Sequence, residues 1–151
     1  MTTLDTNPHF PDPVSHREFY AAVLTKRLIA FLIDSALITM ITVAIVPFTA
    51  FVAVLFFGFL GLIVSLIYRM VSLSRGSATP GMRIMGIEFR THKGERFSSG
   101  MAMAHTILIT ISLSMVVPQV ISIILMLTTS KGQSLIDFLL GTVVINKSAM
   151  N

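Results

Sequence analysis

The sequence predicts an all-α membrane protein, a small bundle of transmembrane helices with a short β-strand or hairpin in a basic cytosolic loop. Hydrophobic residues make up 54% of the 151 residues and charged residues only 12%, about half the roughly 25% that soluble domains carry. A chain with so few charged side chains cannot cover a water-facing surface. The charges it has are also segregated, because six of the eleven Lys and Arg residues lie within residues 69–96.

The first 19 residues are polar and rich in proline, so we expect a flexible cytosolic tail. They do not form a signal peptide, because the apolar run that follows is much longer than an h-region. The membrane domain is expected over residues 20–146, and residues 147–151 form a short tail.

The run from Leu28 to Tyr68 contains a single charge, Asp34. One helix of that length would reach roughly 60 Å at about 1.5 Å per residue, whereas the hydrocarbon core is about 30 Å thick. The run therefore predicts two crossings with a tight turn near Pro47. We expect helices near 25–46 and 50–71.

The segment over residues 72–100 is expected to be the basic loop between membrane helices. The positive-inside rule puts it in the cytoplasm, together with the N-terminus, because Lys26 and Arg27 flank the first helix on that same side. These cations are either ordinary topology determinants or a binding site for anionic lipid head groups.

Within this loop, "MRIMGIEFR" alternates with period two and predicts a strand. Gly94 then predicts a tight turn and a hairpin with Arg96–Ser98. The preceding "SATPG" has the composition of a turn.

The third apolar block, Met101–Thr128, is long for one crossing and too short for two. One tilted helix, kinked near Pro118, is the favoured interpretation, and a re-entrant pair of short helices is the alternative. Beyond it, Ser134–Leu140 predicts one or two helical turns ended by Gly141. Thr142–Ile145 is β-prone and would pair with the loop strand if both lie on one side.

Asp34 is the charge that most needs explaining, because an Asp at the centre of a membrane helix costs about 2.5–3.5 kcal/mol. Arg27 lies seven residues earlier, close to two helical turns, so both side chains share a face. Side chains lean toward the helix N-terminus, so Arg27 leans away from Asp34. We expect either that each finds a partner on another segment or that both share a polar pocket with water. Asp34 is then either a proton or cation acceptor or a staple between segments.

His105 is the only ionisable residue in the third apolar block. It is either a functional group or an interfacial or satisfied packing residue. The four histidines lack metal-ligand spacing, and the chain has no cysteine. No phosphate-binding loop, catalytic triad order or paired-carboxylate motif is present. We therefore expect no enzyme activity, no cofactor, no metal and no nucleic-acid partner.

Three stretches, "RLIAFLID", "TPGMRIMGIEF" and "SLIDFLLGTVV", together resemble the RDD family of small multi-pass membrane proteins, named for one arginine and two aspartates. The resemblance covers about residues 20–146. It implies that Arg27, Asp34 and Asp137 are the arginine and the two aspartates for which the family is named. It also implies a motif loop, which consists of Thr79, Pro80, Gly81, Arg83 and Gly86. The chain departs from the family pattern at Met82, where a lysine is usual, and at His105, where an arginine is common.

The resemblance implies a transport or transport-associated role in a bacterial inner membrane, with cation/proton exchange as one form. In that hypothesis Asp34 accepts the proton or cation, Arg27 is its counter-charge and Asp137 is a second polar partner. The alternative is a non-transporting scaffold or accessory subunit that binds a partner or anionic lipid. A chain with so few spans is expected to form a homo-oligomer or to join another membrane protein.

Overall fold

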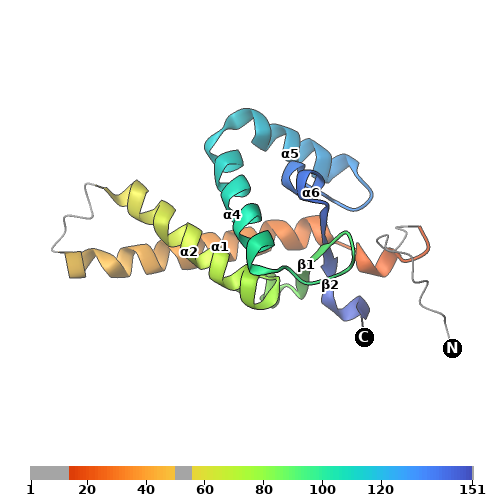
Figure 1. Ribbon diagram of the computed structural model, residues 1–151, viewed down its shortest axis with the longest axis horizontal. Helices are drawn as coiled ribbons and strands as arrows, with labels where there is room; N and C mark the ends of the chain where they lie inside the picture. The colour runs from red at the N-terminus through yellow and green to blue at the C-terminus, as the bar shows by residue number, and fades with distance from the viewer. Residues whose placement is uncertain (1–13, 50–55, 151) are drawn as a thin grey trace.

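The computed structural model describes residues 14–49 and 56–150, and this part of the chain is mainly helical (Figure 1). The elements in chain order are η1 (Arg17–Phe19), α1 (Val23–Ile45), η2 (Val46–Thr49), α2 (Phe57–Gly76), α3 (Pro80–Ile84), β1 (Ile87–Thr91), α4 (Ser99–Ser114), α5 (Val116–Thr128), α6 (Leu135–Leu140), β2 (Thr142–Asn146) and η4 (Lys147–Met150).

Helices α1 and α2 form a long antiparallel pair (Figure 1). The helix expected near 25–46 is α1, and part of the helix expected near 50–71 lies outside the described residues. Helix α2 continues to Gly76, into what the sequence suggested was loop. It ends there because Ser77 adopts the left-handed conformation, with φ +53°, and its N–H bonds to the Leu73 carbonyl.

Both helices are long and apolar enough to cross a membrane, and α4 with α5 makes a third candidate span if the two count as one. Helices α4 and α5 are bent by 111°, so this block is not the single kinked helix that the sequence favoured. The break falls at Met115, which is extended. Pro118 consequently sits in the first turn of α5, where its missing N–H breaks no helical hydrogen bond.

The bent pair leaves and rejoins the same end of the molecule (Figure 1). Just before α4, Phe97 N–H donates to Ser77 Oγ at 2.7 Å, next to the end of α2. Just after α5, the Gly132 carbonyl accepts from Arg27 near the start of α1 at 3.0 Å. A pair bent in this way is either a broken span or a re-entrant loop.

Strands β1 and β2 pair antiparallel, from Ile87 opposite Asn146 to Thr91 opposite Thr142. The pairing expected between the C-terminal segment and the loop strand is therefore confirmed. The expected hairpin with Arg96–Ser98 is wrong. The turn at Gly94 ends in a hydrogen bond from Thr91 N–H to the Glu95 carbonyl, and the strand that pairs with β1 is β2.

The "SATPG" segment is not only a turn, because Pro80 begins helix α3. Thr79 caps this helix, and its Oγ1 accepts from Met82 N–H at 3.3 Å. Proline suits the first helical position because its fixed φ matches the helix. The strand starts only at Ile87, after Gly86 turns the chain with φ +66°.

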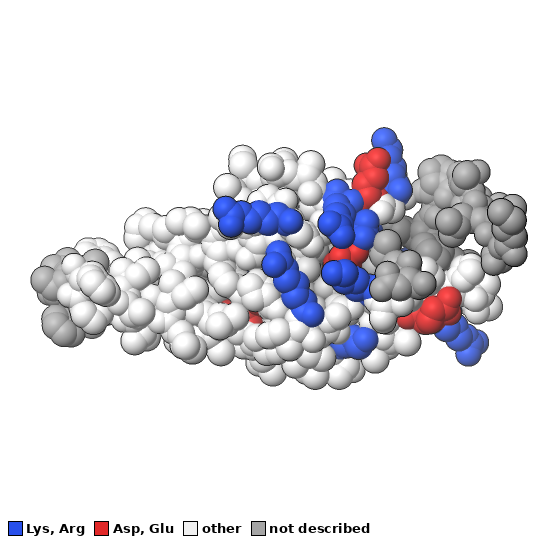
Figure 2. Space-filling model, turned by 90° about the horizontal axis from the view of Figure 1, so that it is seen from below, with Lys and Arg blue, Asp and Glu red and all other residues white. Residues whose placement is uncertain are grey.

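The buried apolar core lies where the sheet meets the ends of α1, α2 and α4, and it includes Val23, Leu73, Met82, Phe89 and Val144. Lys, Arg, Asp and Glu gather over this end of the molecule, whereas the far end of the α1–α2 pair is uncharged on the face seen in Figure 2. The molecule thus has one charged end and one apolar end.

Candidate functional site

Asp34 is 2% exposed and accepts hydrogen bonds from three donors on other segments. Tyr68 Oη donates from α2 at 2.8 Å, and Gly81 N–H donates from α3 at 2.8 Å. The Thr79 hydroxyl donates to the other carboxylate oxygen. A single carboxylate therefore joins α1, α2 and the first turn of α3, and it balances the burial of its charge with hydrogen bonds.

Gly81 is needed at this junction because α3 packs directly against α1. A Cβ at position 81 would lie 2.9 Å from Asp34 Oδ1 and closer still to the Ala30 carbonyl oxygen. Both obstacles are fixed in place, so any side chain would push α3 away from α1. In the motif loop, Thr79 thus caps α3, Pro80 begins it, and Gly81 leaves the space that α1 needs.

Two further motif residues have separate tasks. The Arg83 guanidinium lies so close to Gly76 that a side chain at position 76 would collide with it. Gly86 provides the positive φ that turns the chain from α3 into β1, and its carbonyl accepts from Lys147 N–H at 2.9 Å.

Arg27 makes an ion pair with Asp137, with Nη1 and Oδ2 2.7 Å apart. The Asp137 side chain is fully buried and the Arg27 side chain is 13% exposed. The Arg27 guanidinium also lies over the Phe89 ring, 5.7 Å from its centroid. This pair connects the first helix with the C-terminal helix α6.

Asp137 is held by its own segment as well. It forms a capping box with Ser134 at the start of α6, and it accepts from Thr142 Oγ1 at 3.0 Å. Burial alone would raise the pKa of Asp137, but the charge of Arg27, His105 and the Ser134 hydrogen bond together hold the pKa well below its usual range. Asp137 is therefore an ionised structural carboxylate. Gly141 ends α6 in the left-handed conformation, as expected.

His105 is 2% exposed and lies beside this ion pair. Its Nε2 is 3.5 Å from Asp137 Oδ1, and the rings of Phe89 and Phe97 pack against it at 4.5 and 5.6 Å between centroids. At 3.5 Å this contact is too long for a hydrogen bond, and both ring nitrogens lack a hydrogen-bond partner within the described residues. His105 is thus buried, unlike an interfacial residue, and its nitrogens are unsatisfied.

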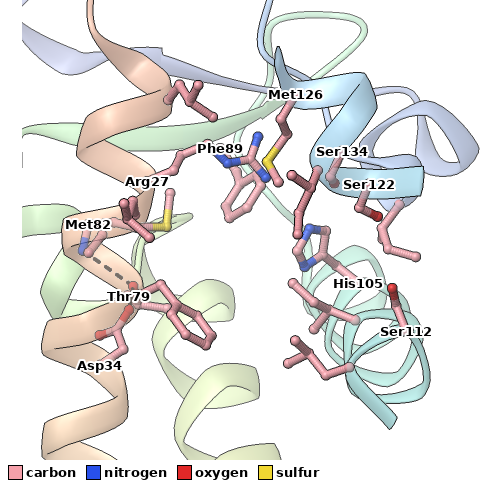
Figure 3. A pocket seen from close by; sticks show the side chains of 18 of the residues that line it. Arg27, Asp34, Thr79, Met82, Phe89, His105, Ser112, Ser122, Met126 and Ser134 are labelled. Atoms are coloured by element: carbon pink, nitrogen blue, oxygen red, sulfur yellow. Dashed lines mark hydrogen bonds between the residues drawn. The ribbon is translucent and has the colours of Figure 1, made fainter. Parts of the chain in front are cut away.

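These groups border a cavity of about 510 Å³ between α1, α4 and α5. Figure 3 shows Asp34 and Thr79 on one wall, His105 and Ser112 on the opposite wall, and the Arg27 guanidinium between Phe89 and Met126. Most of the other lining side chains are apolar. The cavity lies within the size range of small-molecule sites, about 300–1,000 Å³.

The structure gives Arg27 and Asp34 separate partners, as the direction of their side chains predicted. It does not join Arg27, Asp34 and Asp137 into one hydrogen-bonded triad. Arg27 binds Asp137, whereas Asp34 binds the motif loop, and Arg27 and Asp34 meet only as lining residues of the cavity.

Several contributors were not evident from the sequence. Tyr68 gave no signal as a partner of Asp34, and Ser134 and Thr142 were read only as local structure. The S-x-x-D spacing of Ser134 and Asp137 is the one signal that could have indicated the capping box. Asn146, which accepts from Lys26 Nζ at 2.6 Å, was also missed. Among the described residues, no group of His, Asp and Glu could hold a metal ion.

In the comparison with protein families, the model for the RDD family matches residues 21–141. The chain belongs to the RDD family. No curated protein and no solved structure matches it. Together with its apolar helices, RDD membership identifies an integral membrane protein. In this RDD protein, Arg27 and Asp137 form an ion pair, and Asp34 binds the motif loop.

Proposed function

We propose that this protein has a transport or transport-associated role, and that the cavity between α1, α4 and α5 binds its solute. The cavity itself is the observation that carries this proposal. Ionisable side chains are rare in the apolar helices, yet Arg27, Asp34 and His105 all line it. Ionisable groups that face an internal cavity of a membrane protein typically mark a solute or proton path.

The three residues have different roles in this proposal. Arg27, oriented by Asp137, provides a fixed positive charge at one end of the cavity. Asp34 positions the motif loop and is already bonded to three donors. His105 is the candidate for proton exchange, because its two nitrogens make no hydrogen bond among the described residues and its Nε2 lies 3.5 Å from the Asp137 carboxylate. Proton exchange is thus better supported at His105 than at Asp34.

The proposed location is a bacterial inner membrane with the charged end in the cytoplasm. The clustering of Lys and Arg at that end supports this orientation (Figure 2). The pairing of β1 with β2 supports a cytoplasmic C-terminus, because it joins the C-terminal segment to the basic loop. A homo-oligomer or a membrane-protein partner would enclose the solute path more completely than two long helices can.

Flux in proteoliposomes tests the transport role. Vesicles that contain a pH-sensitive dye are given a gradient of Na⁺, K⁺ or butanesulfonate, and proton movement is compared with that in protein-free vesicles. Ser112 is 3% exposed and faces the cavity, so Ser112→Leu should block solute binding. Ser114→Leu is the matched control, because Ser114 lies on the same helix and is exposed. Flux that is absent from the parent, or unchanged by Ser112→Leu, contradicts the proposal.

A second candidate is the non-transporting scaffold, which the bonding of Asp34 favours. A carboxylate that three segments already hold is well suited to fix helix packing. In that case Asp34→Asn lowers the abundance of the folded protein, and the unmodified protein shows no flux in proteoliposomes. The basic loop then binds a partner protein or anionic lipid.

A further inference from the structure

The cavity has free hydrogen-bond donors on several sides. In the described part of the chain, both hydrogen bonds of Arg27 leave from Nη1, so Nη2 and Nε remain available. Arg69 also lines the cavity, and its buried Nε has no partner among the described residues. The nitrogens of His105 make no hydrogen bond there either, although Nε2 lies 3.5 Å from Asp137 Oδ1. Buried donors without partners are costly, at about 1–3 kcal/mol each, which points to a missing acceptor.

The two carboxylates nearest the cavity are largely occupied. A carboxylate offers about four acceptor positions. Asp34 receives three hydrogen bonds, and Asp137 receives four, from Arg27, Thr142 and both the amide and the hydroxyl of Ser134. A cation in the cavity would therefore find few free carboxylate positions and would lie near two guanidinium groups. An anion would find free donors and positive charge.

The walls and the rim of the cavity are apolar. Lining residues on α1 and α5 are strongly exposed to the outside, including Leu28 at 60% and Leu127 at 66%. Phe31 and Ile123, also on these helices, are 41% and 46% exposed. The cavity is thus bordered on the outside by exposed apolar side chains of α1 and α5, the kind of surface that suits lipid rather than water.

We propose that the cavity binds an anionic amphiphile, a molecule with one negatively charged head group and an apolar chain, which enters from the bilayer between α1 and α5. The head group lies among Arg27, Arg69 and His105, and the chain lies along the apolar walls toward Leu28 and Leu127. This proposal rests on the proposed function, since it names the class of solute that the cavity takes.

Thermal unfolding in nanodiscs of zwitterionic lipid tests the proposal. The probes are decanesulfonate, decyltrimethylammonium and decanol, which share a ten-carbon chain but carry a negative, a positive and no charge. A ligand that binds the folded state raises Tm in a concentration-dependent way, and the titration gives an apparent Kd. We expect decanesulfonate to raise Tm and the other two probes to have at least tenfold weaker effects on the concentration scale.

Two matched pairs of variants locate the binding. Ser112→Leu fills the cavity and should abolish the decanesulfonate shift, whereas Ser114→Leu should keep it. Arg69→Gln should weaken binding about tenfold or more, because a charge-assisted hydrogen bond is lost. Arg75→Gln removes the same charge from an exposed position on the same helix and should leave the Kd unchanged.

Three results would overturn the proposal: an equal or larger shift with decyltrimethylammonium, an equal shift with decanol, or a decanesulfonate shift that survives Ser112→Leu. The flux assay keeps this proposal separate from the transport role. Decanesulfonate binding without flux supports the amphiphile site and contradicts the transport role. Flux without decanesulfonate binding supports the transport role and contradicts the amphiphile site.

Discussion

Arg27 Nη1 and Asp137 Oδ2 lie 2.7 Å apart in a buried ion pair, although 110 residues of chain separate them. The same arginine nitrogen donates to the Gly132 carbonyl at 3.0 Å. Two contacts from one side chain therefore tie the start of α1 to the segment that follows α5. This closes the molecule around the cavity.

Removing one partner of this ion pair should destabilise the fold strongly. Arg27→Met leaves the fully buried Asp137 carboxylate without its counter-charge, and the expected loss is about 3–5 kcal/mol of the free energy of unfolding. Unfolding in detergent with increasing denaturant measures this loss. Adding Asp137→Asn should restore part of it, because the uncompensated charge is gone. A double variant no more stable than Arg27→Met would contradict this account of the pair.

Gly81→Ala should destabilise the protein by about 1–3 kcal/mol, as overpacked positions do. The new methyl group would collide with the Ala30 carbonyl and with Asp34, so α3 must shift. Gly58→Ala is the control, since a Cβ there meets nothing within 4 Å. In a helix that change should be neutral or stabilising, by up to about 1 kcal/mol. Equal effects of the two substitutions would mean that α3 does not press against α1.

The pH dependence of stability should carry the signature of Asp137. Its pKa in the folded protein lies below the ordinary value of 3.8: burial raises it, but the charge of Arg27, the nearby His105 and the Ser134 hydrogen bond together outweigh burial. The unfolded state therefore binds the proton more readily. The stabilisation from Asp137 is present above the unfolded pKa of 3.8 and is lost as the pH falls from there toward the folded pKa. Denaturant titrations at several pH values between 3 and 7 measure this. Asp137→Asn should flatten the acid limb, and an unchanged limb would assign it to other groups.

A disulfide can test the strand pairing, because the chain has no cysteine of its own. Thr91 and Thr142 are direct partners across β1 and β2. Directly opposite residues have Cβ atoms about 4.5–5.5 Å apart, close enough for a disulfide after a small adjustment. Thr91→Cys with Thr142→Cys should cross-link on mild oxidation in intact membranes. Thr91→Cys with Asn146→Cys places the thiols at opposite ends of the sheet and should not.

The elements that the sequence predicted well depend on local pattern. Apolar length and charge indicated α1 and α2, Gly141 indicated the end of α6, and β-propensity indicated the pairing of Thr142–Ile145 with the loop strand. The separate partners of Arg27 and Asp34 followed from the direction in which helical side chains lean. RDD membership followed from three short motifs in the right order.

The features that the sequence did not reveal depend on contacts between distant segments. The first turn of α3 is stabilised by Asp34, a residue of α1 that Tyr68 of α2 also bonds, so "SATPG" alone predicted only a turn. The 111° bend lies at Met115 rather than Pro118, because proline is well tolerated in a helix's first turn. The cavity and the unpartnered His105 exist only once α1, α4 and α5 have come together.

The long separation between Arg27 and Asp137 has a consequence for biosynthesis. A ribosome that has just made Arg27 needs a further 110 residues before the partner carboxylate exists, roughly 5–20 s at about 5–20 residues per second. Strand β1 likewise has no partner until β2, near the C-terminal end of the domain, has been made. Nascent and prematurely terminated chains therefore expose an unpaired cation and an open strand edge, and they should be more easily recognised by membrane proteases than the finished protein.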